Sequence, residues 1–165
     1  MMELRRPTLA DKAAVLDMMK EFEMTGSRSD GGFWNQDNFN YEDWLTGNEA
    51  AEMGINIPDG WVPAIQLVSF ENGRALGFLH LRLALNLKLL EKGGHIGYCI
   101  RPSERQKGYA KEQLKQGLLF ATTKNISKVL VTCDDSNEAS RRTILACGGV
   151  LEDVRNGTER YWIEV

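Results

Sequence analysis

The chain has 165 residues, 42% of them hydrophobic, which is enough for one domain with a substantial core and too little for two full-sized ones. Its formal net charge of −3 argues against a nucleic-acid-binding protein, because phosphate backbones are bound through an excess of lysine and arginine. We therefore expect a single domain over residues 1–165 with no nucleic-acid partner.

The cysteines and the apolar segments exclude further classes of protein. Cys99, Cys133 and Cys147 lie in apolar stretches and form no C-x-x-C pair, so neither a disulfide framework nor a metal site is predicted. No apolar stretch reaches the roughly 18–20 residues that span a bilayer, and the N-terminus shows no secretory pattern. These features predict a cytoplasmic protein that uses no metal and does not act at a membrane.

The first third of the chain predicts a short strand, a helix and a long irregular connection. Residues 2–6 favour a strand, and Thr8 with Asp11 resembles a helix N-cap with an acidic first turn. Apolar residues at helical spacing follow: Val15, Met18, Met19 and Phe22. Residues 25–61 are rich in Gly, Asn, Asp and aromatic residues, with one or two short helices expected within 41–53.

The remaining two thirds predicts strands alternating with two helices. Residues 64–70 and 75–83 read as strands joined at Asn72 and Gly73, a strong hairpin signal. Residues 84–94 are expected to be a connection. Four more strands are expected over 95–100, 128–133, 149–154 and 158–165. Two helices are expected over 108–124 and 137–146.

The turn between strand 95–100 and helix 108–124 has the sequence Arg-Gln-Lys-Gly-Tyr-Ala, residues 105–110. The first N–H groups of a helix have no partner inside it and lie at the positive end of its dipole, so a phosphate can satisfy them. Gly108 permits close approach of the backbone, and Ala110 is too small to obstruct it. The sequence therefore predicts an anion site at this turn.

These residues resemble the acyl-CoA motif of the GCN5-related N-acetyltransferases: Arg or Gln, two residues, Gly, one residue, then Gly or Ala. The context strengthens the resemblance. A strand ending in "IRPSER" precedes the motif, an amphipathic helix follows it, and "SNEASRRTILACGG" comes one strand later, as in that family. The resemblance covers most of the chain from residue 64 onward, whereas the first third matches only in the order of its elements.

The family implies an α/β (α+β) fold with a mixed, mostly antiparallel central sheet flanked by helices. Strands 95–100 and 128–133 would splay apart and leave a slot for the pantetheine arm of acetyl-CoA. Residues 1–63 would supply helices and loops on the acceptor side, and residues 64–165 the acyl-CoA-binding core. No metal is implied.

The resemblance also implies which residues bind acetyl-CoA. They are Cys99, Ile100, Arg105, Gln106, Lys107, Gly108, Tyr109, Ala110, Asn137 and Ser140. The N–H groups of residues 106–110 would hold the pyrophosphate, assisted by Arg105 or Lys107, and Asn137 would contact the cofactor arm. Main-chain groups of Cys99 and Ile100 would contact the pantetheine and the thioester carbonyl, where an N–H can stabilise a developing oxyanion.

One position departs from the family pattern. Members often carry a tyrosine seven residues after the asparagine that matches Asn137, poised to protonate the departing thiolate, and this chain has Ile144 there. A thiolate with a reference pKa of roughly 8.5 is a tolerable leaving group without such an acid. Tyr98, Tyr109 or a water molecule could replace it.

The acceptor amine must lose a proton before attack, since its reference pKa is roughly 10.4. His95 is the leading candidate base, because it opens the central strand and histidine titrates near neutral pH. The alternative is a structural histidine, hydrogen-bonded to a neighbouring carbonyl. His80 is expected at a partly exposed strand position and Arg82 on solvated surface, where it could instead bind an acceptor carboxylate. Asp134 and Asp135 could approach the acceptor or cap the next helix.

We therefore expect an enzyme that transfers an acetyl group from acetyl-CoA to an amine of a small molecule or peptide, by direct attack in a ternary complex. The alternative is a module of the same fold that binds or senses acyl-CoA without turnover, as Ile144 suggests. A nucleotide-binding protein of another class is disfavoured, because the chain has no G-x-x-x-x-G-K-[ST] motif. A homodimer is possible through the C-terminal strands.

Overall fold

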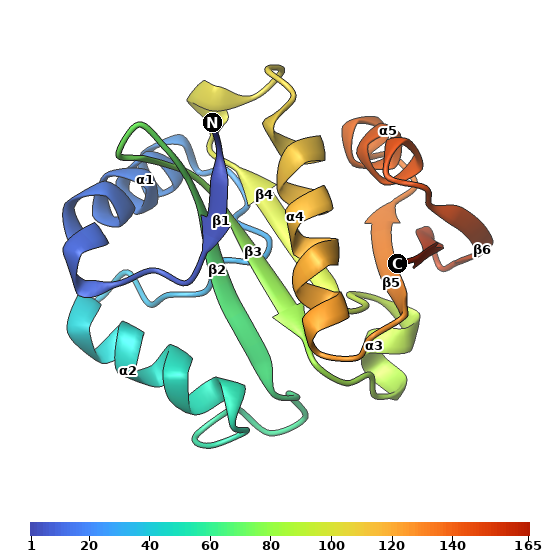
Figure 1. Ribbon diagram of the computed structural model, residues 1–165, viewed down its shortest axis with the longest axis horizontal. Coiled ribbons are helices and arrows are strands. Elements are labelled where there is room, and N and C mark those ends of the chain that lie inside the picture. The colour runs from blue at the N-terminus through green and yellow to red at the C-terminus, as the bar shows by residue number, and fades with distance from the viewer.

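The computed structural model describes residues 1–165, which form two antiparallel sheets with helices on both faces (Figure 1). The first sheet has the order β1-β2-β3-β4 and the second the order β5-β7-β6. The strands are β1 (Glu3–Arg5), β2 (Ala64–Glu71), β3 (Arg74–Arg82), β4 (Ile96–Ile100), β5 (Lys128–Asp134), β6 (Val150–Arg155) and β7 (Thr158–Glu164). The α-helices are α1 (Lys12–Thr25), α2 (Tyr41–Glu52), α3 (Leu87–Glu91), α4 (Tyr109–Thr123) and α5 (Glu138–Ala146). The predicted fold class is confirmed.

The structure differs from the predicted elements at a few boundaries. His95 lies one residue before β4, and Gly108 caps α4 instead of starting it. The segment expected to be only a connection contains α3, whose first turn is held by Asn86: its Oδ1 accepts from the Leu89 N–H at 2.9 Å. A helix of five residues is too short to show an apolar periodicity, which is why the sequence did not reveal it.

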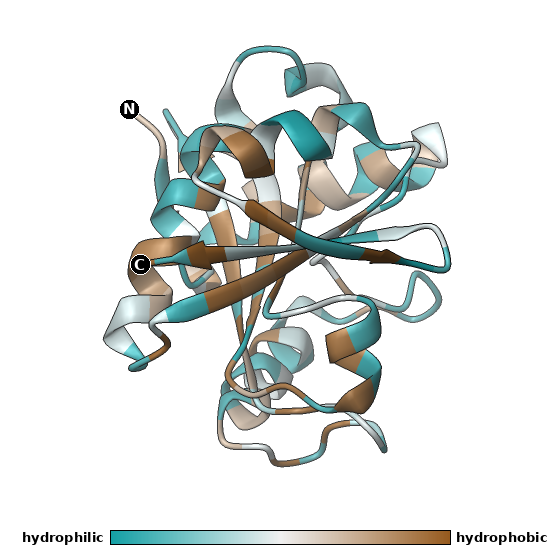
Figure 2. Cartoon of the chain, turned by 90° about the vertical axis from the view of Figure 1, so that its right-hand side faces the viewer, coloured by the Kyte–Doolittle hydropathy of each residue, from teal (hydrophilic) through white to brown (hydrophobic).

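The first sheet is buried on both faces. The larger core cluster, of 15 buried residues, packs α4 and the second sheet against one face, with Leu79, Leu114 and Val131 at its centre. A second cluster of 9 buried residues packs α1 and α2 against the other face, around Phe22 and Phe78. In Figure 2 the hydrophobic residues concentrate on the strands accordingly. Strand β3 therefore presents successive side chains to two different cores.

The two sheets meet between β4 and β5, where residues just before β4 hydrogen-bond β5. The Gly93 N–H donates to Thr132 Oγ1 at 2.9 Å. The His95 N–H donates to the Leu130 carbonyl at 2.8 Å, and the Leu130 N–H donates to His95 Nδ1 at 2.9 Å. A Cβ at Gly94 would lie 2.4 Å from the same carbonyl oxygen, so only glycine fits this approach. Strands β4 and β5 belong to different sheets and part beyond this point, as the family resemblance implied.

The far end of β4 is anchored to α1 by a buried ion pair. Arg101 is 3% exposed and donates to Asp17 at 2.9 Å, to Glu21 at 3.0 Å and to the Ala75 carbonyl at 3.0 Å. Glu21 also accepts from the Ser103 N–H and hydroxyl, both at 2.7 Å. Burial alone would raise the pKa of Glu21, but these hydrogen bonds outweigh it and lower that pKa. Helix α1 therefore fixes the start of the turn that leads to α4.

We expect Glu21→Ala to lower the free energy of unfolding by about 2 kcal/mol, because it removes a charged partner from Arg101 and leaves that guanidinium buried. Asp17→Ala is the matched control: Asp17 also contacts Arg101, but its side chain is 61% exposed, so the loss should stay below about 1 kcal/mol. Urea denaturation of both variants measures the difference. Equal losses would show that Glu21 is not the anchoring partner.

Candidate functional site

The turn before α4 exposes a continuous row of main-chain donors. The N–H groups from Gln106 to Lys111 have no hydrogen-bond acceptor within the chain, and the first intrahelical bond runs from the Glu112 N–H to the Gly108 carbonyl. Gln106 and Gly108 both have left-handed backbone conformations, with φ of 64° and 84°. A Cβ at Gly108 would meet nothing within 4 Å. Unpaired donors at the positive end of a 15-residue helix suit an anionic group.

The side chains of this turn differ in whether they already have hydrogen-bond partners within the chain. Arg105 donates from Nε to the Ile100 carbonyl and from Nη2 to Ser27 Oγ, both at 2.9 Å, so it ties the end of β4 to the loop after α1. Lys107 is 53% exposed and lies 3.4 Å from Glu104, so its ammonium remains accessible to an anion. The hydroxyl of Tyr109 is turned away to Glu71, to which it donates at 2.5 Å.

Strand β4 directs its main-chain groups alternately to β3 and to the gap beside β5. The Arg82 N–H bonds the His95 carbonyl and the Arg101 N–H bonds the Leu76 carbonyl, which sets the phase of the ladder. Because the bonds of an antiparallel pair recur at every second residue, Cys99 pairs with β3, and Tyr98 and Ile100 face the gap. The orientation therefore supports the expected main-chain contact for Ile100 and disfavours it for Cys99.

A pair of hydroxyl groups crosses from β4 to α5. Tyr98 Oη lies 3.1 Å from Ser140 Oγ, and the Ser140 N–H is in turn capped by Asn137 Oδ1 at 3.1 Å. Burial raises the pKa of Tyr98 to about 12, so the hydroxyl keeps its proton. Ile144 is fully buried in the larger core cluster, so position 144 contributes packing. Tyr98 is thus the phenol that the structure brings to the start of α5.

The cysteines behave as core residues. Burial raises the pKa of both Cys99 and Cys133 to about 12, and that of Cys147 is also raised by burial. A thiol with such a pKa is almost entirely protonated near neutral pH and is a poor nucleophile. The surroundings of the three thiols therefore do not suit a cysteine nucleophile.

His95 is held in a form that does not suit a general base. Burial, with a smaller effect of the nearby Arg82 charge, lowers its pKa to about 4. Its Nδ1 accepts the Leu130 N–H, so the neutral ring carries its proton on Nε2. The geometry supports the structural alternative, although the ring accepts from an amide and does not donate to a carbonyl. The role of His95 as base stays a prediction.

Two expectations about the acceptor side were wrong. His80 is only 7% exposed, and Arg82 is half-buried instead of lying on solvated surface. Both lie on the face of β3 that packs towards α1 and α2, and the rings of Phe33 and Trp61 from the long connection pack against His80. This burial could not be predicted from the sequence, because the burial depends on how the long connection folds over the sheet.

The acidic groups at the end of β5 are engaged by basic side chains. Asp134 lies 3.3 Å from Arg28 and 3.8 Å from Lys92, which come from the long connection and from the segment after α3. Asp134 therefore links three segments around the mouth of the gap. Asp135 Oδ lies next to Gly157 in the turn between β6 and β7.

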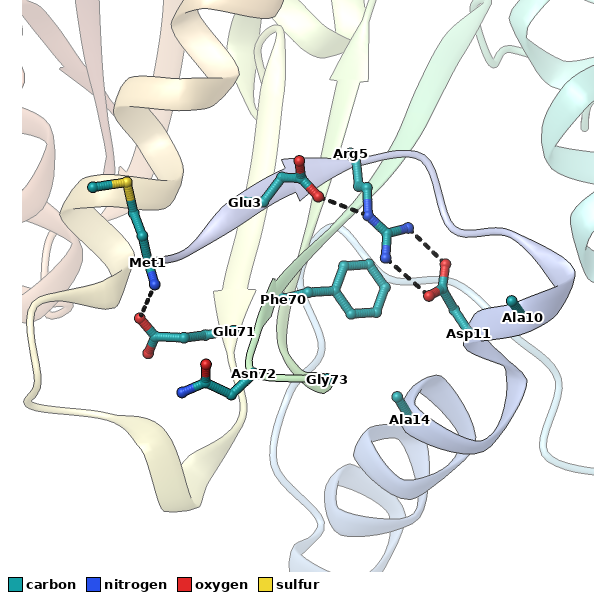
Figure 3. A pocket seen from close by; sticks show the side chains of 10 residues that line it. All are labelled: Met1, Glu3, Arg5, Ala10, Asp11, Ala14, Phe70, Glu71, Asn72 and Gly73. Carbon is teal, nitrogen blue, oxygen red and sulfur yellow. Dashed lines mark hydrogen bonds and ion pairs between the residues drawn. The ribbon is translucent and has the colours of Figure 1, made fainter.

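A separate hollow of about 330 Å³ lies between β1, the start of α1 and the turn from β2 to β3 (Figure 3). Its charged groups pair with one another: Arg5 with Glu3 and Asp11, and the N-terminal ammonium of Met1 with Glu71. No charge in this hollow is left for a ligand.

No group of three or more His, Cys, Asp and Glu side chains is arranged to hold a metal ion. None of the helices combines the length and the apolar character needed to cross a bilayer.

Comparison with known families decides the identity of the fold. Residues 2–150 match the family model described as an acetyltransferase (GNAT) domain. The chain belongs to the GCN5-related N-acetyltransferase (GNAT) family. The resemblance noted from residues 105–110 is thereby confirmed, and the match extends through the N-terminal third, where the sequence showed only a similar order of elements. No curated protein sequence gives a match.

Solved GNAT structures share the fold at low sequence identity. Ribosomal-protein-S5-alanine acetyltransferase from Vibrio fischeri has a TM-score of 0.70 at 14% identity, covering 99% of this chain and 92% of that one. RimJ from Mycobacterium smegmatis, solved with a CoA disulfide, gives 0.68 at 16% identity and covers 99% and 82%. A Salmonella typhimurium acetyl transferase that modifies the N-terminal serine of ribosomal protein L7/L12 gives 0.66 at 17% identity and covers 99% and 95%.

His80 and His95 should make the free energy of unfolding depend on pH. Because folding lowers the pKa of His95 to about 4 and that of His80 to about 3, both below the roughly 6.5 of a free histidine, the native state resists protonation. Their contribution to stability is fully present above about pH 6.5 and is lost as the pH falls through about 4 for His95 and about 3 for His80. In urea denaturation, the urea concentration at the midpoint should decrease as the pH is lowered across this range.

Two variants separate the roles of His95. His95→Asn keeps an acceptor for the Leu130 N–H without a titrating ring, so we expect stability at pH 7 to be retained and its loss at low pH to be smaller. His95→Leu removes the acceptor and should cost about 1–3 kcal/mol. We expect the Asn variant also to retain turnover. A stable Asn variant without turnover would instead support His95 as the base.

Proposed function

We propose that this protein transfers an acetyl group from acetyl-CoA to an amine of a small molecule or peptide, by direct attack in a ternary complex. The observation that carries the proposal is the row of unpaired N–H groups from Gln106 to Lys111, at the start of α4 and beside the gap between β4 and β5. Membership of the acetyltransferase family and the CoA found with RimJ support it.

The residues present fit acetyl-CoA. The N–H groups after Arg105 offer bonds to a pyrophosphate, and the exposed Lys107 adds a positive charge. The main-chain groups of Tyr98 and Ile100 that face the gap suit the amides of a pantetheine arm. Asn137 uses its Oδ1 to cap α5 and keeps its Nδ2 donors for the same arm. When bound, acetyl-CoA would supply an acetyl thioester, and a main-chain N–H of β4 would stabilise the charge on its carbonyl oxygen.

The hydroxyl pair of Tyr98 and Ser140 takes the place of the tyrosine that position 144 lacks. Tyr98 Oη is 3.1 Å from Ser140 Oγ and stays protonated because burial raises its pKa to about 12. Such a hydroxyl stabilises a departing thiolate by donating a hydrogen bond more than by complete proton transfer, since the thiolate is the weaker base.

Proton loss from the acceptor goes to water in this proposal. His95 is neutral with its Nδ1 occupied, and its Nε2 already carries a proton. Asp134 is paired with Arg28 and Lys92. His95 remains the alternative that the Asn variant tests.

The acceptor class rests on the chemistry of the related proteins. The Vibrio fischeri and Salmonella typhimurium proteins are described as acting on an alanine of protein S5 and on an N-terminal serine of L7/L12. These neighbours support an amine acceptor. The decisive experiment is release of CoA thiol from acetyl-CoA across amino acids, polyamines, aminoglycosides and short peptides, and turnover with one class establishes the activity.

A second candidate is an acyl-CoA-binding module without turnover, which the apolar, fully buried Ile144 favours. It predicts that acetyl-CoA raises the melting temperature while every amine in the panel fails. Absence of that thermal shift as well would contradict both candidates.

Gly108→Val should weaken acetyl-CoA binding at least about tenfold, because a branched side chain strains the left-handed turn that orients the row of donors. Gly60→Val is the matched control: Gly60 has φ of 81°, and an added Cβ there also meets nothing within 4 Å. Both variants should lose similar stability, and only the first should lose affinity in calorimetric titration. Unchanged affinity in Gly108→Val would refute the assignment of the anion site.

Tyr98→Phe should lower kcat by about tenfold to a hundredfold while leaving the acetyl-CoA Kd unchanged, because it removes only the hydroxyl that faces the leaving thiolate. Ser140→Ala is the companion variant and should give a smaller loss. Steady-state kinetics with the best amine of the panel, together with titration of acetyl-CoA, measures both. Full activity of Tyr98→Phe would leave water as the proton donor.

A further inference from the structure

Arg82 differs from almost every other arginine in the chain. All arginines except Arg82 and Arg105 form a salt bridge with a carboxylate. Arg105 lies at the turn before α4, on the side assigned to the cofactor. Arg82 lies on the acceptor side, at the end of β3, so one unpaired guanidinium stands on each side of the proposed reaction.

The bonds that Arg82 makes leave one edge of its guanidinium unsatisfied. Nη1 donates to the Gly93 carbonyl at 3.0 Å and to the Gly94 carbonyl at 3.3 Å. Nε and Nη2 donate to no atom of the chain. These two nitrogens form the edge of arginine that binds a carboxylate through two parallel hydrogen bonds.

The surroundings of Arg82 offer no carboxylate in compensation. The nearest acidic influence is Asp30, which forms no salt bridge with it and is instead 3.3 Å from Arg28. Burial lowers the pKa of Arg82 despite that influence. A half-buried cation without an anion is costly, so a bound anion would be favourable at this position.

His80 is a second unsatisfied polar group at the same place. It lies two residues before Arg82 on the same face of β3 and is 7% exposed. Its Nδ1 is buried with no hydrogen-bond partner. The rings of Phe33 and Trp61 cover it, with centroids at 4.9 Å and 6.2 Å, and these two side chains are themselves 39% and 44% exposed. His80 could therefore hydrogen-bond a polar group of a ligand, and the rings of Phe33 and Trp61 could pack against an apolar group.

We infer that Arg82 binds a carboxylate of the acceptor, so that the acceptor is an amine that also carries a carboxylate, as a free amino acid does. This inference rests on the proposed function. The Nε and Nη2 edge of Arg82 binds the carboxylate, His80 supplies a further hydrogen bond, and the exposed rings of Phe33 and Trp61 pack against the carbon skeleton.

The position of Arg82 fits an acceptor that enters from the face opposite to the hydroxyl pair. A Cβ at Gly97 would lie 3.4 Å from Arg82 Nη2, so the guanidinium lies directly over β4 at a residue without a side chain. Gly97 and its partner His80 share this face, whereas the next side chain, Tyr98, points to the α5 side. Donor and acceptor would thus approach β4 from its two faces.

The test compares L-leucine, leucinamide and 3-methylbutylamine, which share a carbon skeleton and differ in the carboxylate. We expect kcat/KM for leucine to exceed that for leucinamide, and Arg82→Gln to lower it for leucine by roughly 10- to 100-fold more than for the other two amines, the equivalent of one charged hydrogen-bonded pair. Arg82→Lys keeps the charge without the two-pronged edge and should recover part of the loss. Losing the bonds from Arg82 to the Gly93 and Gly94 carbonyls would lower kcat/KM for all three amines by a similar factor, so the additional loss for leucine measures the carboxylate contact.

Binding of the products provides a readout that does not need turnover. N-acetyl-L-leucine with CoA should raise the melting temperature of the wild-type protein more than N-acetyl-leucinamide does, and Arg82→Gln should abolish the difference. If this difference appears without turnover of any amine, the carboxylate site stands and the proposed transferase activity fails. The inference would be overturned if the acid and the amide gave equal kcat/KM values and equal thermal shifts. It would also be overturned if Arg82→Gln still preferred the acid to the amide.

Discussion

The contact between His95 and Leu130 is the constraint on which the rest of the structure depends. Two hydrogen bonds, one through the main chain and one through an imidazole nitrogen, join the residue before β4 to β5, next to the bond from the Gly93 N–H to Thr132. A full ladder of hydrogen bonds between β4 and β5 would close the gap, whereas these few bonds join the two strands only at its end. The Leu130 N–H donates to the His95 side chain instead of to a main-chain carbonyl, so the hydrogen bonding between the two strands does not continue as a ladder. The neutral ring that this bond requires is maintained by burial, which holds its pKa near 4.

The gap has a definite use only because the other end of β4 is fixed as well. Arg101 follows the strand directly and is held by Glu21 of α1, which also binds the Ser103 main chain. The turn before α4 therefore starts from a rigid point, and Arg105 closes it against the Ile100 carbonyl. The donors from Gln106 onward can then stay unpaired without collapsing onto the chain. Preorganised donors of this kind bind an anion without a reorganisation cost at the moment of binding.

Local sequence patterns predicted the elements, because each long helix and strand carries its own periodicity. The turn at residues 105–110 could be recognised for the same reason, since its glycine, its helix and its strand are adjacent in the chain. The helix α3 was missed because five residues carry no period. The orientation of Cys99 depends on the phase of the β3–β4 ladder, which no local pattern encodes. The burial of His80 and Arg82 depends on where a connection of more than thirty residues folds back, and Phe33 and Trp61 come from that connection.

The distribution of arginine partners connects the fold with the two substrates. Most guanidinium groups in this chain are neutralised by carboxylates, as expected for a protein with a slight excess of acidic residues. Arg82 and Arg105 instead donate to main-chain carbonyls, which orient a guanidinium without cancelling its charge. Each of them holds a backbone segment at one end of β4, and each keeps a positive charge beside the strand. The proposed binding of a pyrophosphate at one end of β4 and of an acceptor carboxylate at the other would require this arrangement, because a carboxylate supplied by the protein would compete with either ligand.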